Sequence, residues 1–304
     1  MAVFTRLDTS DISALLAPLG YDIASVEPAS HGIENSNFLI RASDADGRPA
    51  GLVLTVLEGI SAATVPWFMT LLDTLEAQGL PVPAPLHEPL AVAGKAALLV
   101  PWLPGHHVET PEAGHCRQLG AALGRLHQCP LPDNPACTDA TALTDLADEI
   151  PRLPPADARY ADALLARWRQ TALPQGLIHA DLFRDNALFD AGHLSGLLDF
   201  YAAGPGPLVF DLAVAINDWC MPGDQPDSAL TEALLAGYRQ QRSLENAEVE
   251  ALPLALAVAA LRFWLSRRRA ERRHEEEQLP DTVRRKDPAQ FQRRLQARLA
   301  QLND

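Results

Sequence analysis

The stretch LIHADLFRDN, residues 177–186, combines a short apolar run with a dense group of polar residues. It opens with two apolar residues and then places a His, two Asp, an Arg and an Asn between His179 and Asn186. Polar side chains this dense are costly to bury unless each finds a partner. We therefore predict a strand that ends in a polar loop, followed by a turn at Gly192 and a second apolar strand.

Three oxygen-bearing side chains stand at the ends of these predicted strands. Asp181 and Asn186 lie five residues apart on the loop, and Asp199 follows thirteen residues later at the end of the second strand. An amide oxygen and a carboxylate suit Mg²⁺, and a further carboxylate can accept a hydroxyl proton. The spacing therefore predicts phosphoryl-transfer chemistry. The plainer alternative is that these residues only cap a turn.

The bulk composition predicts a globular chain. It has 304 residues, 47% hydrophobic, and a formal net charge of −14 that argues against a nucleic-acid partner. There is no run of about 18 apolar residues, so we expect no membrane span, and the acidic start does not resemble a secretion signal. The cysteines fit no zinc or disulfide pattern, so we expect reduced thiols in a cytoplasmic protein. They are Cys116, Cys129, Cys137 and Cys220.

Hydrophobic periodicity and turn residues predict two parts. In the first, we expect helices over 9–20, capped by Thr9 or Ser10, and 64–79, with strands over 36–43, 51–58 and 95–102. The sequence LPG at 103–105 marks a break. Beyond it we expect helices over 111–128, 207–220, 229–241, 246–270 and from 288. The predicted fold class is α+β: a small antiparallel-sheet lobe over 1–103 and a larger, mainly helical lobe over 104–304.

The C-terminal segment is basic in an acidic chain. Between Arg262 and Arg298 there are twelve basic and six acidic residues. We favour a solvated helix face over a binding site for a polyanion.

The segments HADLFRDN (179–186) and LLDFYAAGPGPLVFDLA (197–213) resemble the catalytic segments of the aminoglycoside phosphotransferase and choline kinase group. The resemblance implies a two-lobed protein-kinase-like fold and the use of ATP and Mg²⁺. It implies that Asp181 is the catalytic base, that Asn186 and Asp199 bind Mg²⁺, and that His179 braces the loop. It also implies that Asp211 buttresses the loop. From the residues alone, Asp211 is equally well explained as a helix N-terminal charge.

The lysine that kinases of this group carry on the third strand is absent. Thr55 stands at its position, and the chain has only Lys95 and Lys286. Three explanations stay open: a catalytically silent nucleotide-binding module, substitution by another cation such as Lys95 or Arg41, or a subfamily that dispenses with the lysine.

Further segments support the third explanation. GIENSNFLI (32–40), VLTVLE (53–58), LPVPAPL (80–86), DLAVAINDWC (211–220) and ALRFWLSR (260–267) are together similar to the bacterial homoserine kinases of the phosphotransferase fold. These are unrelated to the GHMP type. The resemblance implies phosphorylation of the L-homoserine hydroxyl, a step towards threonine. The highly charged stretch over 267–288 departs from it. A kinase of another small alcohol or amine, such as choline or an aminoglycoside, remains the alternative.

L-Homoserine presents a carboxylate and an ammonium besides its hydroxyl. For the carboxylate, the candidates are Arg184, with Arg262 and Arg267 as rivals, because a guanidinium matches a carboxylate in shape and charge. A surface salt bridge is the alternative for Arg184. For the ammonium and the walls of the site, the candidates are Asn217, Asp218 and Tyr201; a helix end with a core Trp is the alternative for NDWC.

The nucleotide is expected in the first part of the chain. The segment SHGIENSN (30–37) lies between two predicted strands, and its small and polar residues can donate to phosphates. The candidates are Ser30, Gly32, Asn35, Ser36, Asn37 and Thr55. Adenine is expected against the backbone near Pro101, which has no N–H, so Trp102 or Leu103 must donate.

Overall fold

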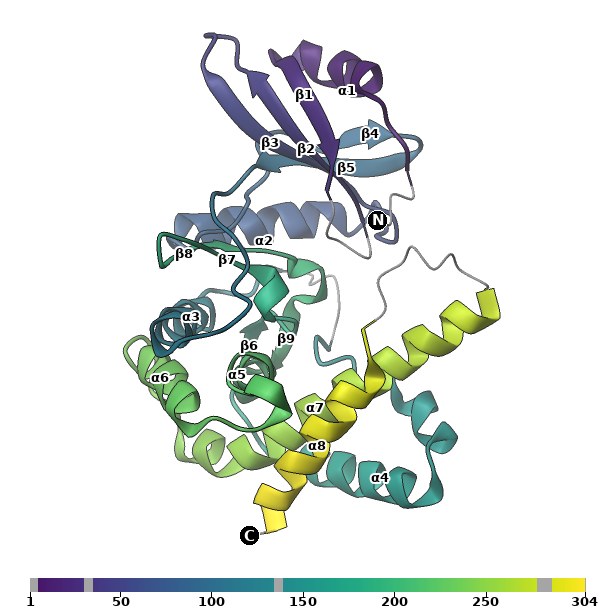
Figure 1. The fold of residues 1–304 in the computed structure, drawn as a ribbon, viewed down its shortest axis with the longest axis vertical. Helices are drawn as coiled ribbons and strands as arrows, with labels where there is room; N and C mark the ends of the chain where they lie inside the picture. Colours follow the sequence, from purple (N-terminus) through teal and green to yellow (C-terminus); the bar gives the residue numbers. More distant parts are fainter. Residues whose placement is uncertain (1–4, 30–34, 134–138, 278–285, 304) are drawn as a thin grey trace. The chain divides into compact units, whose positions relative to one another are not determined.

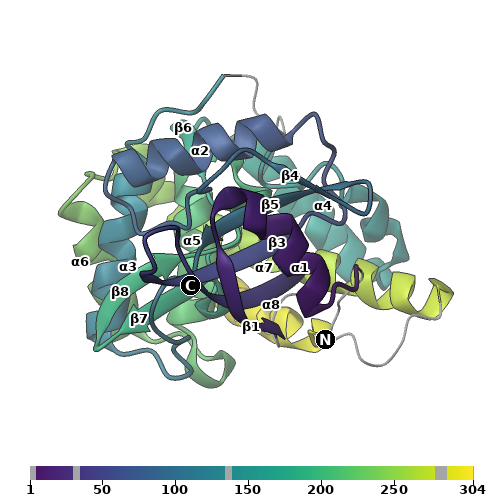
Figure 2. The same cartoon turned by 90° about the horizontal axis from the view of Figure 1, so that it is seen from above.

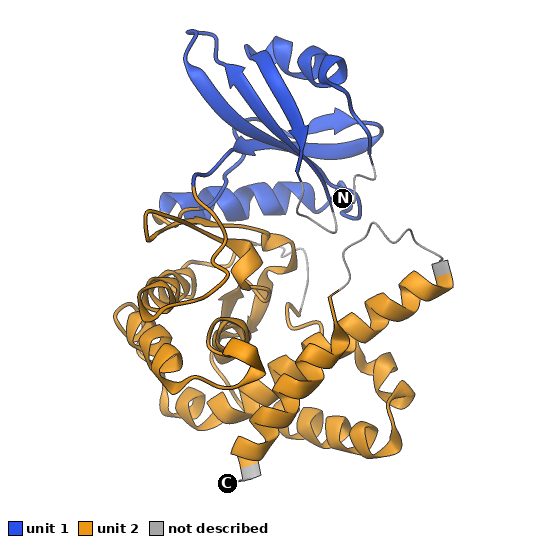
Figure 3. Cartoon of the chain, viewed as in Figure 1, with its two compact units in different colours: residues 1–77, 82–104, 279–284 blue, residues 78–81, 105–278, 285–304 orange. Residues whose placement is uncertain are grey.

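The structure is a computed structural model that describes residues 5–29, 35–133, 139–277 and 286–303. It divides into two compact units (Figure 3). The first comprises residues 1–77, 82–104 and 279–284, and the second comprises 78–81, 105–278 and 285–304. The main division thus follows Pro104. Assigning nucleotide binding to one unit and catalysis to the other stays a prediction.

The first unit is built on a five-stranded sheet. Its strand order is β1-β2-β3-β5-β4, and every neighbouring pair is antiparallel. The strands are β1 (Asp22–Pro28), β2 (Ser36–Ser43), β3 (Pro49–Val56), β4 (Leu90–Val92) and β5 (Lys95–Pro101). Helices α1 (Thr9–Leu16) and α2 (Val65–Ala77) complete the unit.

Side chains alternate between the two faces of this sheet along each strand. Leu52, Leu54 and Val56 of β3 join Ile12 and Leu16 of α1 in one buried apolar cluster. Thr55 therefore lies on the opposite face.

Helix α1 is capped by Asp8, one residue before the first of the two predicted cap residues. The side chain of Asp8 accepts a hydrogen bond from the N–H of Asp11, so the prediction of Thr9 or Ser10 as the cap is wrong. An Asp satisfies the open N–H groups of a first turn as well as Ser or Thr does. The chain turns at Gly20, whose φ of 85° is favourable only without a side chain.

The second unit is mainly helical, with two short antiparallel ribbons, β6–β9 and β7–β8 (Figures 1 and 2). Its helices are α3 (Ala113–Leu126), α4 (Pro155–Arg169), α5 (Leu208–Trp219), α6 (Ser228–Arg239), α7 (Asn246–Glu277) and α8 (Pro288–Asn303). Its strands are β6 (Gln175–Ile178), β7 (Ala187–Asp190), β8 (His193–Leu197) and β9 (Gly204–Pro207). The predicted α+β, two-lobed class is confirmed.

The two ribbons position the polar loop. The loop runs from β6 to β7, and Asp199 lies between β8 and β9. Because Ile178 pairs with Gly204, the chain leaves β6 and enters β9 at the same end of one ribbon. Asp199 is thereby returned to the neighbourhood of the loop.

Helix α7 ends at Glu277, seven residues beyond the predicted range of 246–270. By length and composition alone it could cross a membrane, but 67% of its apolar window is buried inside the fold. It packs against α5, α4 and α8, which is what a core helix does.

The basic segment is not simply a solvated helix face. Arg294 and Arg298 of α8 are 1% and 3% exposed, so that prediction is wrong for these two residues. Both guanidinium groups find acceptors in the second unit, which a charge pattern alone does not indicate.

Candidate active site

The loop after β6 is anchored by the buried carboxylate of Asp211 in the first turn of α5. This carboxylate accepts the N–H groups of His179 at 2.7 Å and Ala180 at 2.8 Å. It also lies 3.1 Å from Nε2 of His127. Burial raises the pKa of Asp211, but the hydrogen bond and charge of His127 outweigh burial and hold it below the ordinary value. These contacts are those that a buttressing role requires.

His179 is fully buried and ties the loop to the end of the second ribbon. Its Nδ1 accepts the N–H of Asp181 at 3.3 Å, so the proton belongs on Nε2, which lies 2.9 Å from the carbonyl oxygen of Leu198. Burial lowers the pKa of His179 despite the nearby charge of Asp211. A neutral His with both nitrogens occupied suits a brace rather than a proton carrier.

Asn186 contacts Asp181 at the end of the loop, and the charge of Asp199 acts on Asp181. The amide nitrogen of Asn186 donates to the carbonyl oxygen of Asp181 at 2.7 Å and to its carboxylate at 3.2 Å. Burial raises the pKa of Asp181 to about 7; the charge of Arg262 opposes this and that of Asp199 adds to it. Asp199 adopts a left-handed backbone, φ 63°, a costly conformation that concentrates at functional sites.

This arrangement fits a hard divalent cation. Because the nitrogen of Asn186 is turned towards Asp181, its amide oxygen is the atom left to act as a metal ligand. Within the part of the chain that the structure describes, no three His, Cys, Asp or Glu side chains are grouped to hold a metal. An amide and a carboxylate could share Mg²⁺ with phosphate oxygens and water, which is the usual preference of that ion.

The strand position that lacks a lysine carries a hydroxyl–amide pair. Thr55 Oγ1 donates to Oδ1 of Asn37 at 2.7 Å, and Thr55 is 7% exposed. The nearest candidate cations are engaged elsewhere in the first unit. Lys95 forms an ion pair with Glu58 and donates to Thr5, while Arg41 stacks 5.2 Å from the Trp102 ring centre. These contacts disfavour both as replacements for the lysine.

The remaining nucleotide candidates are constrained to different degrees. Ser30 and Gly32 lie outside the described residues. Asn35 accepts the N–H of Glu58 at 3.0 Å, and Ser36 donates to the carboxylate of Glu58 at 2.5 Å, so both fix the start of β2. The N–H of Trp102 donates to Gly51 at 2.9 Å, which shifts the expected adenine donor to Leu103.

Two substrate candidates, Arg184 and Asp218, are held in a partly buried ion pair. The backbone N–H and Nε of Arg184 bind one oxygen of Asp218 at 2.9 and 3.1 Å, and Nη1 of Arg184 donates to the carbonyl of Glu109. Burial raises the pKa of Asp218, but Arg184 and Arg294 hold it below the ordinary value. These partners disfavour Arg184 and Asp218 as ligands of a substrate carboxylate and ammonium.

Two other candidates also serve the packing of helices. The amide of Asn217 is fully buried, donating to Leu256 at 2.7 Å and accepting from Arg298 at 2.9 Å. Arg267 donates to Asp287 and Gln290 between α7 and α8, and burial lowers its pKa to about 10. Both lie within α-helical interfaces.

Arg262 and Tyr201 are the two remaining substrate candidates. Arg262 is half-buried on α7, and its positive charge acts on the carboxyl of Asp181. Its Nε lies 3.4 Å from the carbonyl of Thr141. Tyr201 is half-buried in the short 3₁₀ helix Phe200–Ala202 that follows Asp199.

Sequence reasoning missed two residues of this region. Lys286 binds Asp185 at 2.8 Å and lies 5.4 Å from the ring centre of Phe183, and its charge acts on Asp181. His127 at the end of α3 contacts Asp211. Neither carries a local motif, since each meets the loop only through the tertiary fold.

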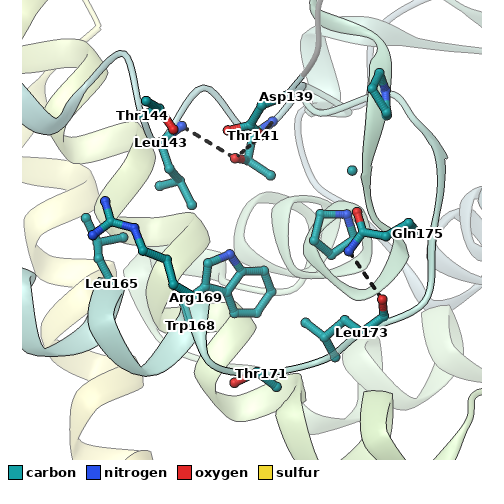
Figure 4. A pocket seen from close by; sticks show the side chains of 13 residues that line it. Asp139, Thr141, Leu143, Thr144, Leu165, Trp168, Arg169, Thr171, Leu173 and Gln175 are labelled. Atoms are coloured by element: carbon teal, nitrogen blue, oxygen red, sulfur yellow. Dashed lines mark hydrogen bonds between the residues drawn. The ribbon is translucent and has the colours of Figure 1, made fainter.

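A cavity of about 320 Å³ lies elsewhere in the second unit (Figure 4). Its walls include Asp139, Trp168, Arg169 and Gln175, and it contains none of the predicted site residues. The candidate active site therefore rests on the polar loop and not on this hollow.

Comparisons with known proteins agree with this geometry. A model of the phosphotransferase enzyme family matches residues 25–252. A homoserine kinase of Pseudomonas aeruginosa (strain UCBPP-PA14) is 40% identical over 98% of this chain and 96% of its own. One from Acidiphilium cryptum (strain JF-5) is 36% identical, covering 98% and 97%.

Solved structures show the same fold at low identity. An amicoumacin kinase, solved with AMP-PNP, Ca²⁺ and amicoumacin, matches with TM-score 0.67 and 18% identity, covering 96% of this chain and 94% of its own. A microcompartment-associated aminopropanol kinase matches with TM-score 0.63 and 17% identity, covering 95% and 94%.

Proposed function

This chain belongs to the phosphotransferase enzyme family, and from that premise we propose that it transfers the γ-phosphoryl group of ATP to the hydroxyl of L-homoserine. The product would be O-phospho-L-homoserine, a step towards threonine. The observation that carries the proposal is the 40% identity to a homoserine kinase along 98% of the chain. The contact of Asn186 with Asp181 and the charge of Asp199 acting on Asp181 support it independently.

In the proposed reaction, Asp181 accepts the hydroxyl proton as the substrate oxygen bonds to the γ-phosphorus. The bond from that phosphorus to the bridging oxygen breaks, and ADP leaves with the electron pair. Asn186 and Asp199 would hold Mg²⁺, which neutralises phosphate charge. His179 and Asp211 hold the loop in one conformation, so the protein acts mainly by positioning the reacting groups and stabilising charge.

Arg262 is the best-supported partner for the substrate carboxylate. The positive charge of Arg262 lowers the pKa of Asp181. A substrate whose hydroxyl reaches Asp181 would therefore place its carboxylate within the field of the Arg262 guanidinium. A carboxylate gains a charge-assisted bond there, whereas a cationic choline or aminoglycoside meets a like charge. This contrast favours an amino-acid substrate over both alternatives.

The missing strand lysine is compatible with this chemistry. The Thr55–Asn37 pair supplies polarity but no charge at the lysine position. Phosphate charge would then be balanced mainly by Mg²⁺ and backbone N–H groups. The metabolic role implies the cytoplasm, which remains part of the proposal.

The proposal is tested by measuring ADP release with L-homoserine, L-serine, L-threonine, choline and an aminoglycoside. Homoserine should give the highest kcat/KM, and Asp181→Asn should abolish most of that signal. A preference for choline or the aminoglycoside would overturn the amino-acid assignment. ATP binding without turnover of any acceptor would support a silent module instead.

A further inference from the structure

Helix α8 buries two arginines four residues apart on one face. Arg294 and Arg298 are 1% and 3% exposed, and both are held by oxygen acceptors. A guanidinium is buried at a large desolvation cost, which only good partners offset. The two arginines are similarly buried, but their hydrogen-bond partners contact different parts of the second unit.

The partners of Arg294 lead to the catalytic loop. Its Nη1 donates to one oxygen of Asp218 at 3.1 Å, and its Nε donates to Asp224 at 3.0 Å. The other oxygen of Asp218 accepts the backbone N–H of Arg184 at 2.9 Å and its Nε at 3.1 Å. Asp218 therefore joins α8 to the first residue of the short helix Arg184–Asn186.

That short helix ends in the residue that touches the base. Asn186 holds both the carbonyl and the carboxylate of Asp181 through its amide nitrogen. An apolar contact runs beside this polar route, since the rings of Phe291 on α8 and Phe183 on the loop lie 5.9 Å apart. Helix α8 is thus connected to the catalytic loop through both polar and apolar contacts.

The partners of Arg298 lead away from the loop. Its Nε donates to Asn217 at 2.9 Å, and Asn217 donates to the carbonyl of Leu256 on α7 at 2.7 Å. This route joins α8 to the α5–α7 packing. Arg298 therefore serves as a control for Arg294, being of the same residue type, on the same helix and similarly buried. Its partners, Asn217 and Gln301, are neutral, and its Nη2 is buried with no hydrogen-bond partner among the described residues.

We propose that Arg294 and Asp218 are positioning residues, through which the C-terminal helix fixes the catalytic loop by way of Arg184. The kinetic consequence rests on the proposed kinase function; the structural one does not. Without Arg294, one oxygen of buried Asp218 loses its partner, and the carboxylate no longer holds Arg184 in one orientation. A displacement of about 1 Å in a catalytic group can cost about 100-fold in rate.

The test compares Arg294→Met with Arg298→Met in the full chain. Kinetics with L-homoserine should show kcat falling at least about 10-fold for Arg294→Met, with the KM for ATP changed less than kcat. Arg298→Met should keep kcat within a few-fold. Arg294→Lys, which keeps the charge and can keep one bond, should recover part of kcat and serves if the Met variant does not fold.

A second readout does not depend on the reaction. Hydrogen–deuterium exchange of peptides covering residues 179–186 should be faster in Arg294→Met than in Arg298→Met or the wild type. Equal exchange and equal kcat in the two Met variants would overturn the positioning role. If the wild type phosphorylates none of the acceptors, the proposed function fails, and the exchange data alone decide the role of Arg294.

Discussion

At the scale of single residues, Asp181 combines a carboxylate with a site that makes ionisation costly. Burial raises its pKa to about 7. A base works only when deprotonated, so kcat/KM should fall as the pH drops below about 7. Asp181→Asn should lower kcat by about 10² to 10⁴-fold and leave ATP binding intact. Steady-state kinetics against pH and ATP titration check this; activity within threefold of the wild type would refute the assignment.

Arg262 and Arg184 differ in what their guanidinium groups contact, and this predicts different substrate effects. Losing a charge-assisted bond to the carboxylate costs about 1.5–3 kcal/mol, so Arg262→Met should lower kcat/KM for homoserine about 10- to 100-fold. 3-Aminopropanol, which lacks the carboxylate, should be a poor substrate that is nearly indifferent to this change. Arg184→Met should slow both substrates alike because it disturbs the loop. Equal losses in Arg262→Met would exclude Arg262 as the carboxylate partner.

Asp199 and Asn186 should contribute unequally to metal binding. Asp199→Ala removes a charged ligand, whereas Asn186→Ala removes a neutral one, so Asp199→Ala should lose more of the thermal stabilisation that ATP with Mg²⁺ provides. Asp190→Ala, an exposed Asp at the end of β7, is the control and should behave as the wild type. The measurement is melting temperature against Mg²⁺ at fixed ATP. The reverse order of effects would mean that the ligand roles are wrong.

At the scale of elements, helices α3 and α6 approach too closely for a side chain at Gly120. A Cβ there would lie 2.0 Å from the carbonyl oxygen of Leu234. Gly120→Ala should therefore destabilise the chain by about 1–3 kcal/mol through overpacking. Gly114→Ala, in the same helix with nothing within 4 Å, should be neutral or stabilising by up to about 1 kcal/mol. Denaturant unfolding of both variants checks this, and equal effects would contradict the packing described here.

Elements with a strong local pattern could be predicted, and those made by tertiary context could not. Strand β2 occupies the predicted residues 36–43 because its alternating pattern matches a sheet with one buried face. Strand β9 was missed because its sequence, GPGP, disfavours a strand on propensity. It forms because Gly206 lets the chain lie against Ile178, where a Cβ would be 2.3 Å away.

The same distinction applies to the candidate site. His179, Asp181, Asn186 and Asp199 follow one another along a short segment, so their chemistry could be predicted from spacing. The roles of Arg184 and Asp218 could not, because their pairing joins residues 34 apart. An Arg in a motif is free for a substrate only if the fold provides no closer carboxylate. Here Asp218 is that carboxylate.

At the scale of the whole molecule, the family resemblance and the loop chemistry agree on phosphoryl transfer. The match to a family model over residues 25–252 includes the sheet as well as the loop. The similar solved structures, at 17% and 18% identity, show the fold alone. The substrate is therefore decided by chemistry around Asp181, where Arg262 stands, and by likeness to relatives at 36–40% identity.

Identifying the product of a single reaction tests the proposed activity most directly. The chain is incubated with ATP, Mg²⁺ and an equimolar mixture of L-homoserine and choline, and the products are identified by mass spectrometry. We predict O-phospho-L-homoserine in amounts equal to the ADP formed, little phosphocholine, and neither product with Asp181→Asn. Phosphocholine as the main product, or ADP without phosphorylated homoserine, would contradict the assignment.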